Sequence, residues 1–150
     1  MFYLNQLGMV CPLGNTCDDI KRRMLDSAQS GVVMTETYSP GCPLPLGQID
    51  TGLALPSVEE LPMRDRSRNN QLALAALTPI RPAVDAAIER YGTDRIGIVI
   101  GTSTSGMAEG ESALRHHAIT GRMPESFHYG QQELGSPAAM LAATLGIGGP

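Results

Sequence analysis

The sequence has no tryptophan, and its two phenylalanines and four tyrosines make aromatic residues only 4% of 150. Proteins that bind single-stranded nucleic acid stack bases on aromatic side chains, and few are present here. Charged residues are also scarce, at 17%, and the net charge is −4. The basic face of a nucleic-acid-binding protein is therefore missing. We expect no nucleic-acid partner.

Long hydrophobic runs are absent as well. No stretch approaches the ~20 apolar residues of a membrane span, so we expect no membrane association. Residues 1–14 are apolar but lack a positively charged start, and polar residues, glycine and proline interrupt them. That pattern differs from a secretory signal peptide. We therefore expect a cytoplasmic protein.

Cysteine is rare, with Cys11, Cys17 and Cys42 lacking the C-x-x-C spacing of metal and redox sites. We interpret them as free thiols, with Cys11 packed in a turn and Cys17 on the apolar face of a helix, where its spacing predicts that it is buried in the core. His116 and His117 are adjacent on a predicted helix, so they point to different sides and cannot pair at a metal. We expect no metal and no cofactor.

The first third of the chain predicts a strand, a helix and an irregular region. Residues 2–8 have strand character. Asn15 or Thr16 can cap a following helix, in which Cys17, Ile20, Met24 and Ala28 recur at helical spacing and Gly31 marks the stop. Prolines and glycines interrupt residues 32–62, where short strands are expected at 32–34 and 46–49.

The rest of the chain alternates helical and strand patterns. A helix begins near Ser67, and Pro79 and Pro82 should split or kink it before Gly92 ends it. Residues 96–100 form a continuous apolar run, which is typical of a strand covered by helices on both faces. A Gly/Ser/Thr turn at 101–106 leads into a helix through Ala118. The last helix is expected over 138–145, with Ser136-Pro137 at its start and Gly146 as its stop.

Helices alternating with buried strands predict an α/β layered fold. Four segments, residues 7–15 (LGMVCPLGN), 64–76 (RDRSRNNQLALAA), 95–106 (RIGIVIGTSTSG) and 145–150 (LGIGGP), stand in a fixed order along nearly the whole chain. In order and spacing they resemble the β-ketoacyl-acyl-carrier-protein synthases, or ketosynthases. The resemblance implies a thiolase-like fold with layered helices on a mixed sheet. Residues 1–150 match the N-terminal portion of its N-terminal domain, which would be incomplete and truncated before the nucleophile strand.

The resemblance implies a decarboxylating Claisen condensation in fatty-acid or polyketide synthesis. A cysteine takes an acyl chain from carrier protein, and two histidines assist malonyl-carrier protein as it loses CO2 and attacks. In the family these three residues follow the position of Pro150, so no catalytic residue is carried onto this chain and the fragment alone is expected to be inactive. An alternative is a non-catalytic partner of the chain-length-factor type. An unrelated α/β ligand-binding module with a Ser/Thr-rich loop is a third.

The resemblance also suggests binding residues. Thr104 falls where the family often has a bulky residue that gates the acyl pocket, and a threonine there would admit a longer or unusual chain. This loop lacks the lysine of a P-loop and the spacing of a dinucleotide site. Phe127 and His128 match residues that line the partner's acyl pocket across the dimer, although ordinary packing under a loop explains them equally well.

Three arginines near the start of the second helix are the candidates for carrier-protein docking. They are Arg64, Arg66 and Arg68, and charge complementarity would steer an acidic carrier protein toward them. Surface ion pairs with Asp65 and Glu60 are the alternative. The partners implied by the resemblance are acyl carrier protein and a second subunit, in a homodimer or in a ketosynthase/chain-length-factor heterodimer.

Overall fold

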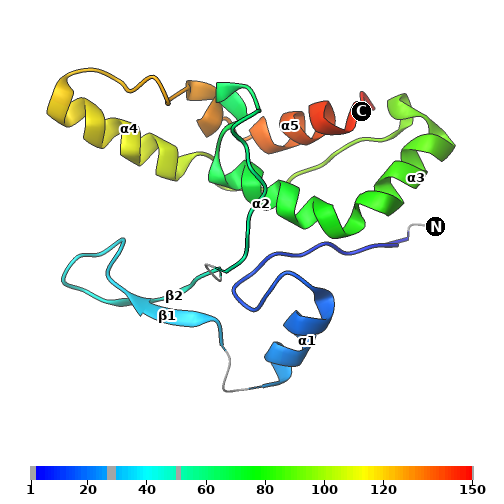
Figure 1. Ribbon diagram of the computed structural model, residues 1–150, viewed down its shortest axis with the longest axis horizontal. Coiled ribbons are helices and arrows are strands. Elements are labelled where there is room, and N and C mark those ends of the chain that lie inside the picture. Colours follow the sequence, from blue (N-terminus) through cyan, green and yellow to red (C-terminus); the bar gives the residue numbers. More distant parts are fainter. Residues whose placement is uncertain (1–2, 27–29, 50–51, 150) are drawn as a thin grey trace. The chain divides into compact units, whose positions relative to one another are not determined.

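The computed structural model describes residues 3–26, 30–49 and 52–149 (Figure 1). The chain divides into two compact units, the first of Met1–Leu55 and Ala75–Arg81 and the second of Pro56–Leu74 and Pro82–Pro150. In chain order the longer elements are α1 (Cys17–Leu25), β1 (Val32–Thr35), β2 (Leu44–Gly47), α2 (Arg68–Leu77), α3 (Arg81–Tyr91), α4 (Met107–Thr120) and α5 (Ser136–Leu145). Short 3-10 helices are η1 (Met63–Asp65), η2 (Thr78–Ile80), η3 (Thr93–Arg95) and η4 (Tyr129–Gln132).

Helix α1 begins at the predicted cap. The Thr16 hydroxyl accepts a hydrogen bond from the Asp19 N–H at 3.1 Å, and Asp18 and Asp19 occupy the first turn, where the helix dipole favours negative charge. The helix ends at Leu25, before the expected stop at Gly31. Ala28, expected on its apolar face, lies outside the described residues.

The apolar face of α1 is open, contrary to the expected packing of Cys17. Ile20 is 5% exposed, but Met24 is 70% exposed and Cys17 is exposed too. The Cys17 thiol contacts the Leu7 carbonyl oxygen at 3.7 Å. Together with Leu7, Met9 and Met24 these residues line a hollow of about 300 Å³. The helical spacing identified the right face, but among the described residues no element covers it.

The two predicted strands of the irregular region form an antiparallel hairpin. Strand β1 pairs with β2, with Val32 opposite Gly47 and Thr35 opposite Leu44. The connecting turn is closed by the Glu36 carboxylate, which accepts the Gly41 N–H at 3.1 Å. Gly41 has a φ of 78°, which favours glycine over any other residue. Strand β2 begins two residues before the predicted start.

The prolines split the long helical pattern as expected. Pro79 stands in the first turn of η2 and Pro82 in the first turn of α3, where a missing N–H costs no helical hydrogen bond. Gly92, with a φ of 88°, follows the end of α3. Tyr91, the last residue of α3, is 52% exposed.

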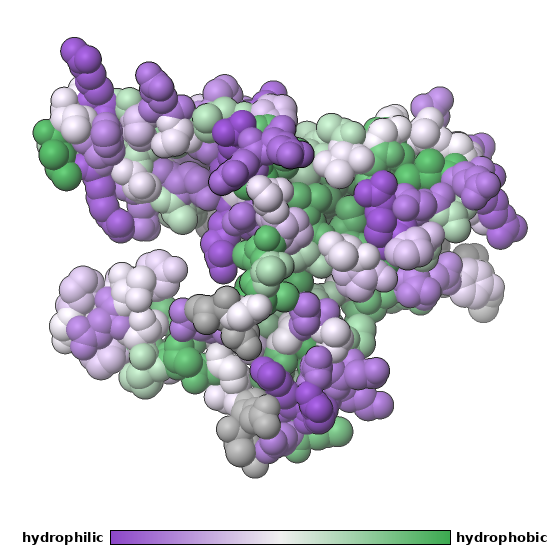
Figure 2. All heavy atoms as spheres, in the orientation of Figure 1, coloured by the Kyte–Doolittle hydropathy of each residue, from purple (hydrophilic) through white to green (hydrophobic). Residues whose placement is uncertain are grey.

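The second unit has a core in which apolar and polar side chains mix. Ala113, Met140, Leu141 and Ile147 are its buried apolar residues. Its buried polar residues are Ser67, Asn70, Ser105, Gln131 and Ser136. Outside the core, Figure 2 shows a largely hydrophilic surface over the visible face of α4. His116 and His117 on that helix are both exposed.

Two expected strands do not form. Residues 3–8 have no strand pairing, and residue 2 lies outside the described residues. The run 96–100 is also unpaired, with Val99 95% and Ile100 38% exposed. A strand exists only with a partner that completes its hydrogen-bond ladder. Before this run, in η3, the Thr93 carbonyl oxygen accepts a hydrogen bond from the Gly148 N–H at 3.2 Å.

The described architecture is therefore a mixture of helices with a small sheet. Among the described residues the sheet is β1–β2 alone and antiparallel, in contrast to the mixed sheet covered by helices that the sequence suggested. The last helix starts at Ser136 with Gly135 as its cap, one residue earlier than expected. Ser136 is therefore the first helical residue and not the cap, and its hydroxyl accepts a hydrogen bond from Asn70 Nδ2 at 3.3 Å.

Candidate functional site

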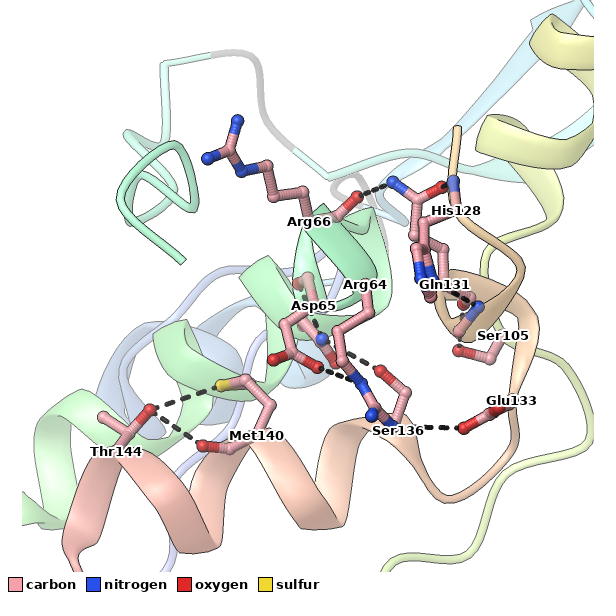
Figure 3. A network of polar contacts seen from close by, with 12 residues as sticks. Arg64, Asp65, Arg66, Ser105, His128, Gln131, Glu133, Ser136, Met140 and Thr144 are labelled. Atoms are coloured by element: carbon pink, nitrogen blue, oxygen red, sulfur yellow. Dashed lines mark hydrogen bonds and ion pairs between the residues drawn. The ribbon is translucent and has the colours of Figure 1, made fainter. Parts of the chain in front are cut away.

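All six candidate binding residues belong to the second unit. They lie on three segments: residues 61–68 around η1, the loop 101–106, and residues 124–133 around η4 (Figure 3). The segments are far apart in sequence, and a network of polar contacts joins them.

Gln131 is the centre of this network. The residue is 1% exposed. Its side-chain oxygen accepts the His128 N–H at 2.9 Å, and its side-chain nitrogen donates to the Arg66 carbonyl at 2.8 Å and the Ser126 carbonyl at 3.4 Å. Its own backbone carbonyl accepts the Ser105 hydroxyl at 3.0 Å. Figure 3 shows Arg66, Ser105 and His128 around it, so one residue contacts all three segments.

His128 caps η4. Its Nδ1 accepts the Gly130 N–H at 2.9 Å, and the contact of Gln131 with the His128 N–H completes a reciprocal capping box. Because Nδ1 is an acceptor here, a neutral ring carries its proton on Nε2. The side chain is exposed. His128 thus has a local structural role and still presents an N–H donor to solvent.

Arg64 lies against the same turn. A Cβ added at Gly130 would stand 2.8 Å from Arg64 Cβ and 3.0 Å from His128 Nδ1, so only glycine permits this approach. The Arg64 guanidinium is 3.3 Å from the Glu133 carboxylate and 3.8 Å from that of Asp65. Its side chain is half exposed, which leaves it accessible to a partner.

The other two arginines differ in their surroundings. Arg66 is half-buried, and its Nε donates to the Leu61 carbonyl at 2.7 Å. Arg68 is exposed and is the first residue of α2; its backbone N–H donates to the Glu109 carboxylate at 2.8 Å. The sequence alternative of pairing with Glu60 is not among the described ion pairs. Glu133 and Glu109 instead provide the contacts near Arg64 and Arg68.

Thr104 is held through its backbone. Its carbonyl oxygen accepts hydrogen bonds from Asn69 Nδ2 at 2.9 Å and from the Thr102 hydroxyl at 2.6 Å. The residue is exposed. The loop ends at Gly106, where φ is 58° and an added Cβ would collide with the Gln131 carbonyl. Helix α2 and η4 therefore fix the loop on both sides of Thr104.

A hollow of about 400 Å³ opens between the η1 segment, helix α4 and the η4 segment. Phe127 and Arg66 line it, together with Met63, Ala108, Glu109, Ser112, Ala113, Pro124, Ser126 and Gln131. One predicted acyl-pocket residue and one predicted docking residue therefore meet at the same hollow. Thr104, His128, Arg64 and Arg68 are not part of its lining.

Three residues on which this site depends were not predicted from the sequence: Gln131, Glu109 and Asn70. A signal for Gln131 was present, since a polar residue followed three positions later by Gln, as in His128 and Gln131, is a capping-box pattern. Glu109 and Asn70 form hydrogen bonds with residues more than 30 positions away in the sequence. No local sequence pattern predicts such contacts.

Among the residues that the structure describes, no group of three or more His, Cys, Asp or Glu side chains could hold a metal ion. Within the same residues, every helix is too short or too polar to cross a membrane. Cys11, Cys17 and Cys42 are free thiols, and all three lie in the first unit. The network in the second unit contains none of them.

No family model matches the sequence, and no curated protein matches it. Among solved structures, the chain is similar to a chain of a ketosynthase in complex with its chain length factor from Xenorhabdus doucetiae. The two are 38% identical with a TM-score of 0.86, over 99% of this chain. The match spans 37% of the length of that chain. Identity at this level together with the shared fold supports a relationship to the thiolase-like ketosynthases.

Proposed function

We propose that these residues are the N-terminal portion of a ketosynthase-type subunit. The observation that carries the proposal is the 38% identity to a chain of a ketosynthase complex, maintained over 99% of this chain. The four sequence segments that resemble the family point the same way. The 37% coverage of that chain leaves room for further residues in a longer protein.

The proposed reaction is a decarboxylating Claisen condensation. An acyl group moves from carrier protein to a cysteine thiolate, with the carrier thiol as leaving group. Malonyl-carrier protein then loses CO2, its α-carbon attacks the acyl carbonyl, and the cysteine thiolate is released. In this proposal the nucleophile comes from residues outside this sequence, because the resemblance places it after the position of Pro150.

We assign the acyl pocket to Thr104, Phe127 and His128. Phe127 is half-buried at the lining of the hollow, a suitable contact for an acyl chain. Thr104 presents an exposed side chain from a loop that its backbone holds in place. In this proposal Thr104→Leu adds bulk at the gate of the pocket and shortens the products, while the melting temperature changes little because the side chain is exposed.

We assign carrier-protein docking to Arg64, Arg66 and Arg68, and we expect the three arginines to contribute unequally to binding. Arg64 and Arg68 are exposed and present charge to an acidic partner, whose approach would be faster at low salt. Arg66 is half-buried and its Nε is already bonded to the Leu61 carbonyl. Its part in the proposal is to shape the hollow beside the docking surface.

A second candidate function follows from the same comparison. The similar structure is a complex of a ketosynthase with its chain length factor, and both kinds of subunit are compatible with the described residues. As a chain-length-factor-type subunit, this protein would pair with a catalytic ketosynthase and bind the growing acyl chain without forming a covalent bond to it.

One reconstitution distinguishes the two functions. The full-length protein is purified alone and with a candidate catalytic ketosynthase from the same source, and each sample receives acyl- and malonyl-carrier protein. Condensed product from the protein alone supports a ketosynthase. Product only from the mixture, and from neither subunit separately, supports the chain-length-factor function. If neither the protein nor the mixture releases CO2 or forms product, while a known ketosynthase does so in parallel, the proposed function is wrong.

A further inference from the structure

We propose that Gln131 is a positioning residue that sets acyl-chain selectivity by fixing the pocket segment against the docking segment. The inference rests on the proposed function, which assigns Phe127 and His128 to the acyl pocket and Arg64 and Arg66 to the docking surface. Gln131 belongs to neither assignment.

The nitrogen and the oxygen of the Gln131 side-chain amide are both hydrogen-bonded within the protein. Both hydrogens of Nε2 are donated, one to the Arg66 carbonyl and one to the Ser126 carbonyl, and Oε1 accepts the His128 N–H. At 1% exposure no water can replace these partners easily. The amide is consequently a clamp, because it holds the backbone of Arg66 to the backbone of Ser126 and His128. An acyl chain in the hollow would contact the segments that this clamp holds together.

The Gln131 amide links residues to which the proposed function gives two different roles, acyl-chain binding and carrier-protein docking. Phe127 lies between Ser126 and His128, and both of these neighbours are bonded to the Gln131 amide. Arg66 is bonded on the other side, at the end of η1. Any displacement of Gln131 therefore moves Phe127 relative to Arg66, across the hollow that both line.

A third segment is attached through the backbone of the same residue. The Ser105 hydroxyl donates to the Gln131 carbonyl, and Gly106 packs against that carbonyl. Thr104, the proposed gating residue, is adjacent to Ser105. The loop that carries Thr104 and the segment that carries Phe127 are thus both hydrogen-bonded to Gln131.

The test uses Gln131→Met in the full-length protein, with its catalytic partner if it requires one. Methionine is close in size to glutamine but makes none of the three amide hydrogen bonds. The matched control is Gln71→Met, where the same change removes a single long bond of 3.4 Å to the Pro56 carbonyl. Small displacements of positioned groups cost large factors in rate. We expect the ratio of long to short products to change by about tenfold in Gln131→Met, and by less than about twofold in the control.

A milder variant guards against a failure to fold. Ser105→Ala removes only the bond to the Gln131 carbonyl, and we expect it to shift the product ratio in the same direction by a smaller factor. All products are measured at a temperature at which circular dichroism shows each variant to be folded. A purely structural role of Gln131 would lower the melting temperature and leave the product ratio unchanged, which would overturn the proposal.

Hydrogen exchange supplies a readout that does not depend on activity. In Gln131→Met the amides of residues 124–132 and 64–67 should exchange faster, while those of α3 remain as in the wild type. Unchanged exchange in both segments overturns the positioning role even when the wild type is active. If the wild type makes no product, the proposed function is wrong, and so is the proposed effect of Gln131 on selectivity. If hydrogen exchange in Gln131→Met still increases in both segments, the role of Gln131 in holding those segments is supported separately.

Discussion

The Glu109 carboxylate on α4 accepts the backbone N–H of Arg68, the first residue of α2, at 2.8 Å. The first N–H groups of a helix have no partner inside the helix. Here Ser67 Oγ accepts the Asn70 N–H at 3.3 Å, and Glu109 supplies a second acceptor from 41 residues away in sequence. The negative charge also faces the positive end of the helix dipole.

Removing this cap should destabilise the fold measurably. We expect Glu109→Ala to lower the free energy of unfolding by about 0.5–2 kcal/mol, the usual range for a lost helix cap, as measured by urea denaturation. The control is Glu111→Ala on the same helix, which breaks an exposed pair with Arg115 and should cost about 0.3–0.5 kcal/mol. Equal losses in the two variants would show that Glu109 does not act as a cap.

Asn70 and Asn69 are adjacent but should respond differently to the same substitution. Asn70 is 0% exposed, and its Nδ2 donates to the Asp65 carbonyl at 2.7 Å and contacts Ser136. Asn70→Asp places a carboxylate against that carbonyl, and a buried unpaired charge costs about 3 kcal/mol or more. Asn69→Asp loses one bond, to the Thr104 carbonyl, and should cost about 1 kcal/mol.

Thermal unfolding of both variants gives the comparison directly. If Asn70→Asp melts within a few degrees of Asn69→Asp, then the buried position tolerates the carboxylate. The polar core described around Asn70 would then contribute less to stability than its burial suggests.

Gly130 and Gly135 offer a second matched pair. Alanine at position 130 would place its Cβ 2.8 Å from Arg64 Cβ, and overpacking of this kind typically costs about 1–3 kcal/mol. Gly135 has φ −77° and ψ −13°, with open space around its Cβ position. Gly135→Ala should therefore stabilise the protein by about 0.4–1 kcal/mol, because it restricts the unfolded chain.

The two alanine variants should shift the melting temperature in opposite directions. Gly130→Ala should also raise the KM for acyl-carrier protein, since Arg64 must move to make room. A lowered melting temperature with an unchanged KM would argue against a docking role for Arg64.

Arg68 tests the docking proposal with little risk to the fold. The side chain is exposed, so Arg68→Gln should leave the melting temperature nearly unchanged. In the reconstituted enzyme, the KM for acyl-carrier protein should rise several-fold at low salt and the difference should shrink at high salt, because rim charges act mainly on association. Arg115→Gln, on α4 at 76% side-chain exposure, is the control and should leave the KM unchanged.

The local signals of the sequence were reliable for helices. Thr16 caps α1, Pro79 and Pro82 divide the second helical pattern, and Gly146, with a φ of 64°, follows the end of α5. Each of these features depends on residues within one or two turns. Strands were predicted less well, because the run 96–100 has the composition of a buried strand but pairing depends on a distant segment that composition does not specify.

In the candidate site, too, the contacts between distant segments were not predicted from the sequence. Arg64, Phe127 and His128 were proposed through the resemblance to a family, and the structure places them on segments that meet. The residues that join those segments were not found, since Gln131 and Glu109 act through single hydrogen bonds across long sequence separations. Burial of Cys17 was predicted from helical spacing and was wrong, because spacing defines a face but not whether another element covers it.

Gly106 limits how the Thr104 loop can be exchanged between related proteins. Its left-handed backbone and its packing against the Gln131 carbonyl exclude every side chain at the point where the loop enters α4. A graft of residues 101–104 from a relative can therefore differ in composition, provided that its junction precedes Ser105 and that glycine is retained at 106. Chimaeras joined beyond that point would have to rebuild η4 together with the loop.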